Sequence, residues 1–225
     1  MTFSIVARCE ETGQFGVAIS SSSPAVAARC AWAQAGTGAV ATQNVTNPAL
    51  GPKMLDELAK SANAADAVTA ARQSDGFPDY RQLLAIDAEG NTAIHSGPKA
   101  LGIWTSASGR QCVAAGNLLA NDSVPQGMVN AFEATPGSLG DRLVAALKAA
   151  VEAGGEAGPV RSAGLLIVDK QSWPYAEVRI DWLDEGCPIT AVAQAWAVYK
   201  PQAADYVTRA LNPLAAPSYG VPGDE

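Results

Sequence analysis

Histidine is almost absent from this chain, because His95 is the only one among 225 residues. A single histidine excludes a metal centre built on several imidazoles. The four cysteines lie far apart and have no CxxC spacing, which disfavours the usual zinc sites and disulfide frameworks. We therefore expect ordinary buried thiols, no metal and no cofactor.

Positive charge is also scarce, with 15 Lys and Arg against 22 Asp and Glu and a net charge of −7. An acidic surface disfavours nucleic acid or an anionic membrane as the main partner. Neither a signal-peptide pattern nor an apolar run of membrane-spanning length is present. We predict a cytoplasmic protein that takes a small-molecule substrate and forms a homo-oligomer.

Apolar residues, in contrast, are plentiful: hydrophobic residues make up 48% of the chain and charged residues 16%. This composition provides for a sizeable core and excludes global disorder. No internal repeat or linker divides the chain. We predict a single domain over residues 1–211, followed by an extended or poorly ordered tail over 212–225 that is rich in Ala and Pro.

Two apolar runs at the N-terminus flank a short polar loop that ends in Gly13, as in a β-hairpin. The alternation in the first run places Phe3, Ile5 and Ala7 on one face, suited to a core. Thr2 and Ser4 bring hydroxyl groups to the opposite face. The apolar face and the partner strand predict that Thr2 lies at the end of a central strand.

Thr2 stands directly after the initiator methionine. Removal of Met1 would give Thr2 a free α-amine, and a hydroxyl beside its own amine is a complete nucleophile-plus-base unit. An α-amine titrates near pH ~8, so much of it accepts a proton at neutral pH. If Met1 stays in the natural protein, this mechanism fails. A threonine in a strand also needs no functional reason.

The remaining pattern predicts strands and helices that arrive in pairs. Strands that arrive in hairpins favour antiparallel sheets, and paired helices can cover an outer sheet face. The count fits an α+β protein, a four-layer αββα sandwich of two antiparallel sheets. After the hairpin we expect a short apolar segment at 25–31, strands at 37–43, 81–87, 92–97, 111–119, 163–169 and 176–182, and helices at 49–59, 64–74, 123–133, 138–150 and 188–199.

Amide side chains gather where two predicted strands end. Gln43, Asn44 and Asn47 follow one strand, and Gly116-Asn117 closes another. Amide groups can bind an amide substrate, and Asn117 can donate to an oxyanion as a catalytic residue. Helix capping explains Asn47 equally well, and a tight turn is the better local interpretation of Gly116-Asn117. We predict that Gln43, Asn44 and Asn117 converge near Thr2.

Two further residues complete the candidate site. Arg29 is the only cation between Arg8 and Lys53 and can lower the pKa of a neighbouring amine, although it cannot accept a proton. An ion pair with a surface carboxylate is an equally good interpretation of Arg29. His95 joins the substrate-binding candidates, although a lone histidine without an acidic partner is more often structural.

Several stretches of the chain form a combined pattern: Thr2–Ala7, Gly16–Ala18, Gly38–Gln43, Thr46–Pro48, Gly51, Gly116–Leu119 and Arg161–Ala163. Together they resemble a bacterial family known as the domain of unknown function 1028. The resemblance runs from Thr2 to about Tyr199.

That family is similar to the N-terminal-nucleophile hydrolases, which implies the same αββα fold. One departure concerns the turn 182–186, where the family often has an acidic pair with a histidine that this chain lacks. We expect a hydrolase that cleaves a C–N bond of a small amide through Thr2. The alternatives are a non-catalytic binding protein with the same cleft and a structural oligomer.

Overall fold

Two antiparallel sheets form the centre of the computed structural model, which describes residues 1–223. The six-stranded sheet has the order β10-β9-β2-β1-β8-β7, and the four-stranded sheet has the order β3-β4-β5-β6. The strands are β1 (Thr2–Arg8), β2 (Phe15–Ser21), β3 (Ala31–Gln34), β4 (Gly38–Asn44), β5 (Arg81–Ile86), β6 (Thr92–Ser96), β7 (Ile103–Gly109), β8 (Cys112–Leu119), β9 (Ser162–Val168) and β10 (Ala176–Ile180).

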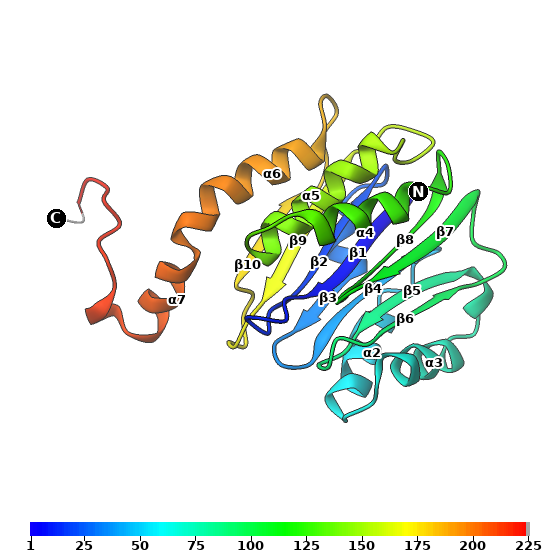
Figure 1. Ribbon diagram of the computed structural model, residues 1–225, viewed down its shortest axis with the longest axis horizontal. Coiled ribbons are helices and arrows are strands. Elements are labelled where there is room, and N and C mark those ends of the chain that lie inside the picture. The colour runs from blue at the N-terminus through cyan, green and yellow to red at the C-terminus, as the bar shows by residue number, and fades with distance from the viewer. Residues whose placement is uncertain (224–225) are drawn as a thin grey trace.

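Helices cover the outer faces of both sheets (Figure 1). The helices α4, α5 and α6 pack on the six-stranded sheet, and α2 and α3 pack on the four-stranded sheet. The protein is therefore the predicted αββα sandwich. The helices are α1 (Val26–Cys30), α2 (Leu50–Ala59), α3 (Ala64–Ser74), α4 (Val124–Ala134), α5 (Leu139–Glu152), α6 (Pro188–Tyr199) and α7 (Ala203–Leu211), with short 3-10 turns at Pro78–Tyr80, Lys200–Gln202 and Pro213–Ala215.

Strand alternation divides the side chains of β1 as predicted. Phe3, Ile5 and Ala7 are fully buried and join the core beneath α4 and α5. Val6 points the other way, into the apolar layer between the two sheets. Because the side chains of a strand alternate, Thr2 and Ser4 share the inter-sheet face with Val6. The first strand thus contributes to two layers of the core and brings two hydroxyl groups between the sheets.

The strand β1 lies inside the six-stranded sheet, between β2 and β8. Its first residue, Thr2, is paired with Asn117 of β8, and Phe3 is paired with Ser20 of β2. The prediction that Thr2 begins a central strand is therefore confirmed. Hydrogen bonding on both sides fixes this end of the chain more firmly than a sheet edge would.

Several predicted elements differ from the structure. The segment 25–31 forms the short helix α1 before β3 begins, so Arg29 lies on a helix. Gly116 and Asn117 lie inside β8 rather than in a turn, and the left-handed residue is Leu118 (φ 50°). Asn47 does not cap α2, whose N-cap is Ala49 without a side-chain hydrogen bond. The Ser138 cap of α5 is confirmed, with a complete capping box.

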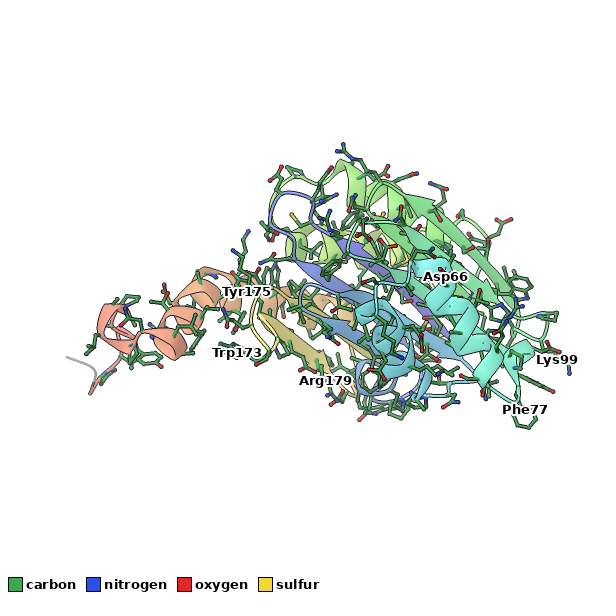
Figure 2. All side chains as sticks on the ribbon, turned by 90° about the horizontal axis from the view of Figure 1, so that it is seen from below. Asp66, Phe77, Lys99, Trp173, Tyr175 and Arg179 are labelled. Carbon is green, nitrogen blue, oxygen red and sulfur yellow. The ribbon has the colours of Figure 1, made fainter. Side chains whose placement is uncertain are left out.

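Three helices and strands are absent from the prediction. One is the short strand β3, which pairs with β4. Another is β7, whose polar and small residues pair with β8 at the sheet edge. The third is α7, which follows the predicted last helix and projects away from the sandwich with the C-terminal segment (Figure 1). Figure 2 shows Trp173 and Tyr175 near the base of this projection. Residues 224 and 225 of the predicted tail lie outside the described residues.

Candidate functional site

Thr2 lies at the centre of a row of polar side chains on the inter-sheet face. In the strand registers Thr2 stands opposite Asn117 on one side and next to the end of β2, where Ser21 lies, on the other. The Oγ1 of Thr2 is 3.3 Å from the Oγ of Ser21, and both side chains are buried. Three adjacent strands therefore present one hydroxyl or amide group each to the same space.

A chain of contacts connects Thr2 with Arg29. The Oγ atoms of Ser21 and Ser23 are 2.8 Å apart, and Nη2 of Arg29 donates to Oγ of Ser23 at 3.1 Å. Within residues 1–223 the guanidinium of Arg29 forms no ion pair with a carboxylate and instead also donates to the carbonyl of Pro24. Arg29 thus places a fixed positive charge two hydroxyl groups away from Thr2.

A second polar network joins the two sheets beside Thr2. Gln82 of β5 is its hub: its Oε1 accepts from Gln43 at 2.7 Å and from Asn117 at 3.1 Å. Its Nε2 donates to Oγ of Ser96 and to the carbonyl of Gly116. Gln43 also accepts from the hydroxyl of Ser4 at 2.7 Å. We call Ser4, Gln43, Gln82, Ser96 and Asn117 the inter-sheet network.

One atom of this network has no partner. The Oδ1 of Asn117 is buried and accepts no hydrogen bond from any described residue. A buried amide oxygen without a donor costs roughly 1–3 kcal/mol. Because Asn117 is paired with Thr2 across the strands, this free acceptor lies beside the start of β1.

The structure brings together only part of the candidate set. Thr2, Arg29, Gln43, Gly116 and Asn117 lie within the two connected groups described above. The remaining three, Asn44, Asn47 and His95, bond elsewhere: to the carbonyl of Tyr80, to Asp75 and to the carbonyl of Pro78, respectively.

The reason for this separation is the alternation of the strands. Asn44 follows Gln43, so it points away from the inter-sheet face, and its positive φ (76°) ends β4. His95 pairs with Leu83, whose side chain faces α2 and α3, while its neighbour Ser96 faces the network. The predicted convergence therefore holds for Gln43 and Asn117 but not for Asn44.

Glu156 is the residue that sequence reasoning missed. It bridges Leu119 of β8, two residues beyond the pair formed by Asn117 and Thr2. Both of its carboxylate oxygens accept from the backbone N–H of Ser22, at 3.0 and 3.2 Å. Only 5% of the residue is exposed. The carboxylate therefore lies beside the start of β1 and the end of β2.

Burial raises the pKa of Glu156 to about 7, although the chain-terminal ammonium and the bonds from Ser22 act in the opposite direction. A carboxyl group with this pKa exchanges protons near neutral pH, which is a common property of functional sites. The only signal in the sequence is an isolated glutamate after the pair Gly154-Gly155.

Met1 covers this site. Its carbonyl oxygen accepts hydrogen bonds from the hydroxyls of both Thr2 and Ser21. Its terminal methyl group lies against the backbone of Gly158, because a Cβ placed there would be 3.3 Å from that methyl. A separate cavity of about 790 Å³ lies at the opposite end of β1, around Arg8, and includes no residue of the inter-sheet network.

Among the described residues, no cluster of three or more His, Cys, Asp or Glu side chains is arranged to hold a metal ion. No described helix is long and apolar enough to cross a membrane. The chemistry available at the site is that of hydroxyl groups, amides, one buried carboxyl group and one guanidinium.

The sequence pattern of the Family of unknown function (DUF1028) matches residues 2–192. The chain belongs to this family. The DUF1028 match thus includes Thr2, Arg29, the inter-sheet network and Glu156, and it stops before α7 begins.

One of the solved structures that match this chain has the same fold. The chain is similar to the DUF1028 protein SPO2555 from Silicibacter pomeroyi, with 31% identity, a TM-score of 0.83 and coverage of 91% of this chain and 92% of that one. It also matches the Anbu (Gly-1) mutant from Hyphomicrobium sp. strain MC1 (15% identity, TM-score 0.40, coverage 92% and 99%). A third match is Anbu (ancestral beta-subunit) from Yersinia bercovieri (12%, 0.38, 92% and 97%). No curated protein matches this chain.

Proposed function

We propose that this DUF1028 protein is an N-terminal-nucleophile hydrolase that cleaves a C–N bond in a small amide, with Thr2 as the nucleophile once Met1 has been removed. The observation that carries this proposal is the position of the Thr2 hydroxyl. It is buried at the first residue of an interior strand, within 3.3 Å of Ser21 and beside Asn117. A threonine whose only role was to pair in the sheet would not require polar side chains around its hydroxyl group.

The reaction uses groups of this chain only. The free amine of Thr2 takes the proton of its hydroxyl while Oγ1 attacks the carbonyl carbon of the substrate. The C–N bond then breaks, and the leaving nitrogen takes that proton from the Thr2 ammonium. Water attacks the resulting ester, again with the amine as base, and releases the acid together with unmodified Thr2.

Ser21 is the best candidate for stabilising the oxyanion. Its hydroxyl donates to the carbonyl oxygen of Met1, which also accepts from the Thr2 hydroxyl. A substrate carbonyl attacked by Thr2 would place its oxygen within reach of the same donor. Arg29 supports this arrangement through Ser23, since it binds the hydroxyl that contacts Ser21.

Retention of Met1 favours the alternative of a non-catalytic binding protein. In that case Thr2 has no amine, and the single histidine bonds to Pro78 and offers no replacement base. Intact mass of untagged protein distinguishes the two cases. The oligomeric state and the cytoplasmic location stay predictions.

The test is hydrolysis of a panel of small amides by four proteins. The first is untagged protein that has lost Met1, and the second retains a residue before Thr2. The third carries Thr2→Ala, and the control carries Thr12→Ala in the exposed hairpin loop. Blocking the amine or removing the hydroxyl should lower turnover about 10²- to 10⁴-fold. Thr12→Ala should retain full activity. Equal activity of the blocked or Thr2→Ala protein, with folding checked by circular dichroism, refutes the proposal.

A further inference from the structure

Met1 lies on the proposed site in the way an acyl group would. Its carbonyl oxygen contacts the hydroxyls of Thr2 and Ser21, and its side chain ends against Gly158. The carbonyl carbon of Met1 is bonded to the backbone nitrogen of Thr2. The first residue of the chain therefore displays which groups of the site face which parts of an aminoacyl unit.

Glu156 lies beyond the start of β1, on the side of the chain terminus. It bridges Leu119 of β8, two residues beyond the pair of Thr2 with Asn117, and its carboxylate accepts from the N–H of Ser22. In residues 1–223 no lysine or arginine side chain pairs with it. Burial raises its pKa, and the chain-terminal ammonium of Met1 lowers it from outside ion-pair distance.

A buried carboxylate that lacks a cationic side chain is costly to the fold. Such a group is retained when a ligand or a chain terminus supplies the missing charge. The nearby amides and hydroxyls are neutral, so Glu156 is the only described acid in direct contact with the end of β2 at this site. Because Arg29 donates to Ser23 and Pro24 and not to Glu156, the carboxylate of Glu156 suits a ligand with one positive charge.

We infer that the substrates are α-aminoacyl amides, whose ammonium group is bound by Glu156 while their carbonyl group faces Thr2 and Ser21. This inference rests on the proposed function. A substrate would follow the path of Met1, displaced by about 2 Å, because its carbonyl carbon must approach Thr2 without a covalent bond to the Thr2 nitrogen.

Side-chain selectivity should be weak. The methyl group of Met1 meets Gly158, and the neighbouring residues Ala157 and Pro159 are exposed. A wall that is open to solvent excludes few side chains. The protein should therefore distinguish its substrates by the free amino group and accept several different residues at the acyl position.

Glu156 has one competing role, which is to hold the amine of Thr2 itself after Met1 has left. The two roles differ in their effect on ligands. A carboxylate that binds the substrate changes the affinity of ligands with an amino group only. A carboxylate that positions Thr2 changes all substrates alike, through kcat.

The experiment uses protein whose mass confirms loss of Met1, carrying Thr2→Ala so that no turnover occurs. Calorimetry compares L-methioninamide with its analogue lacking the amino group, 4-(methylthio)butanamide. L-Methioninamide should bind about 10- to 100-fold more tightly, as expected for a hydrogen bond between charged groups. Adding Glu156→Gln should remove this preference by weakening L-methioninamide alone. Glu152→Gln, an exposed carboxylate at the end of α5, is the matched control and should retain it.

Hydrolysis by the Thr2 protein should show the same preference, mainly in KM. Equal binding of the two amides, binding of neither, or an equal loss of both in Glu156→Gln overturns the inference. A clear binding preference without hydrolysis would instead refute the proposed function and leave the ammonium site in place. Thr2-dependent hydrolysis of both amides at equal rates would support the proposed function but refute the ammonium site at Glu156.

Discussion

Glu156→Gln should stabilise the Met1-containing protein at pH 8. The wild-type carboxyl group has a pKa of about 7 in the folded state against an ordinary value of 4.5, because it is buried. The folded state therefore holds the proton more tightly than the unfolded chain does. Ionisation opposes folding, so stability falls as the pH rises from about 4.5 to 7 and is constant above that.

The size of this effect follows from the shift. A difference of about 2.5 pKa units corresponds to about 3 kcal/mol in the free energy of unfolding at 1.36 kcal/mol per unit. Glutamine keeps an oxygen that accepts from the N–H of Ser22, and it carries no charge at any pH. The gain in stability should thus be near zero at pH 4 and close to this full value at pH 8.

Urea denaturation at a series of pH values, followed by circular dichroism, measures the gain as a difference between variant and wild type. Titrating groups that do not interact with Glu156 cancel in this difference. The control Glu152→Gln should give a flat line, because that carboxylate is exposed. A flat or falling difference for Glu156→Gln would show that the buried carboxylate is compensated in the folded protein and would refute the reasoning.

Three other results are expected. Gln82→Leu should lower the free energy of unfolding by about 3 kcal/mol or more in urea denaturation, because it leaves several buried groups of the inter-sheet network without partners. The exposed control Gln126→Leu should change it little, and equal losses would contradict this. Asp75→Asn should lower the free energy of unfolding by about 3 kcal/mol at pH 7, because it removes the charged partner of the buried Arg81 guanidinium, 2.6 Å away. The difference should shrink in acid, since the hydrogen bond from Arg81 holds the pKa of Asp75 below its usual range. Iodoacetamide at pH 8 should alkylate Cys187 before Cys112, whose pKa burial raises to about 12, and mass spectrometry of the peptides would reveal the opposite order.

The fold could be predicted from the sequence where the pattern was local. The alternation of Phe3, Ile5 and Ala7 with Thr2 and Ser4 requires only the two-residue period of a strand, and the structure follows it. The paired helices followed from their apolar stripes. Segments with weak patterns were predicted wrongly or missed, such as α1, which has five residues, and β7, whose side chains are mostly small or polar.

The site was harder to predict, because its residues come together only through pairing between distant strands. Gln82 is a polar residue inside an apolar strand, and this contrast is a usable signal of a buried polar role. Glu156 had no such signal. Its place depends on the bridge to Leu119 and on the N–H of Ser22, which is 134 residues away along the chain. No local rule identifies a loop glutamate that becomes buried in this way.

The inter-sheet network has a mechanical consequence. Hydrogen bonds are directional, so the bonds from Ser4, Gln43 and Gln82 fix the two sheets to each other at the end where Thr2 lies. Farther along, Val6, Val17 and Ile86 join the sheets by apolar contact, which has no preferred direction. Any shear between the sheets should therefore pivot at the network and displace the hairpin loop near Gly13 the most. Amide exchange on β1 and β2 would detect this as protection that decreases steadily away from Thr2.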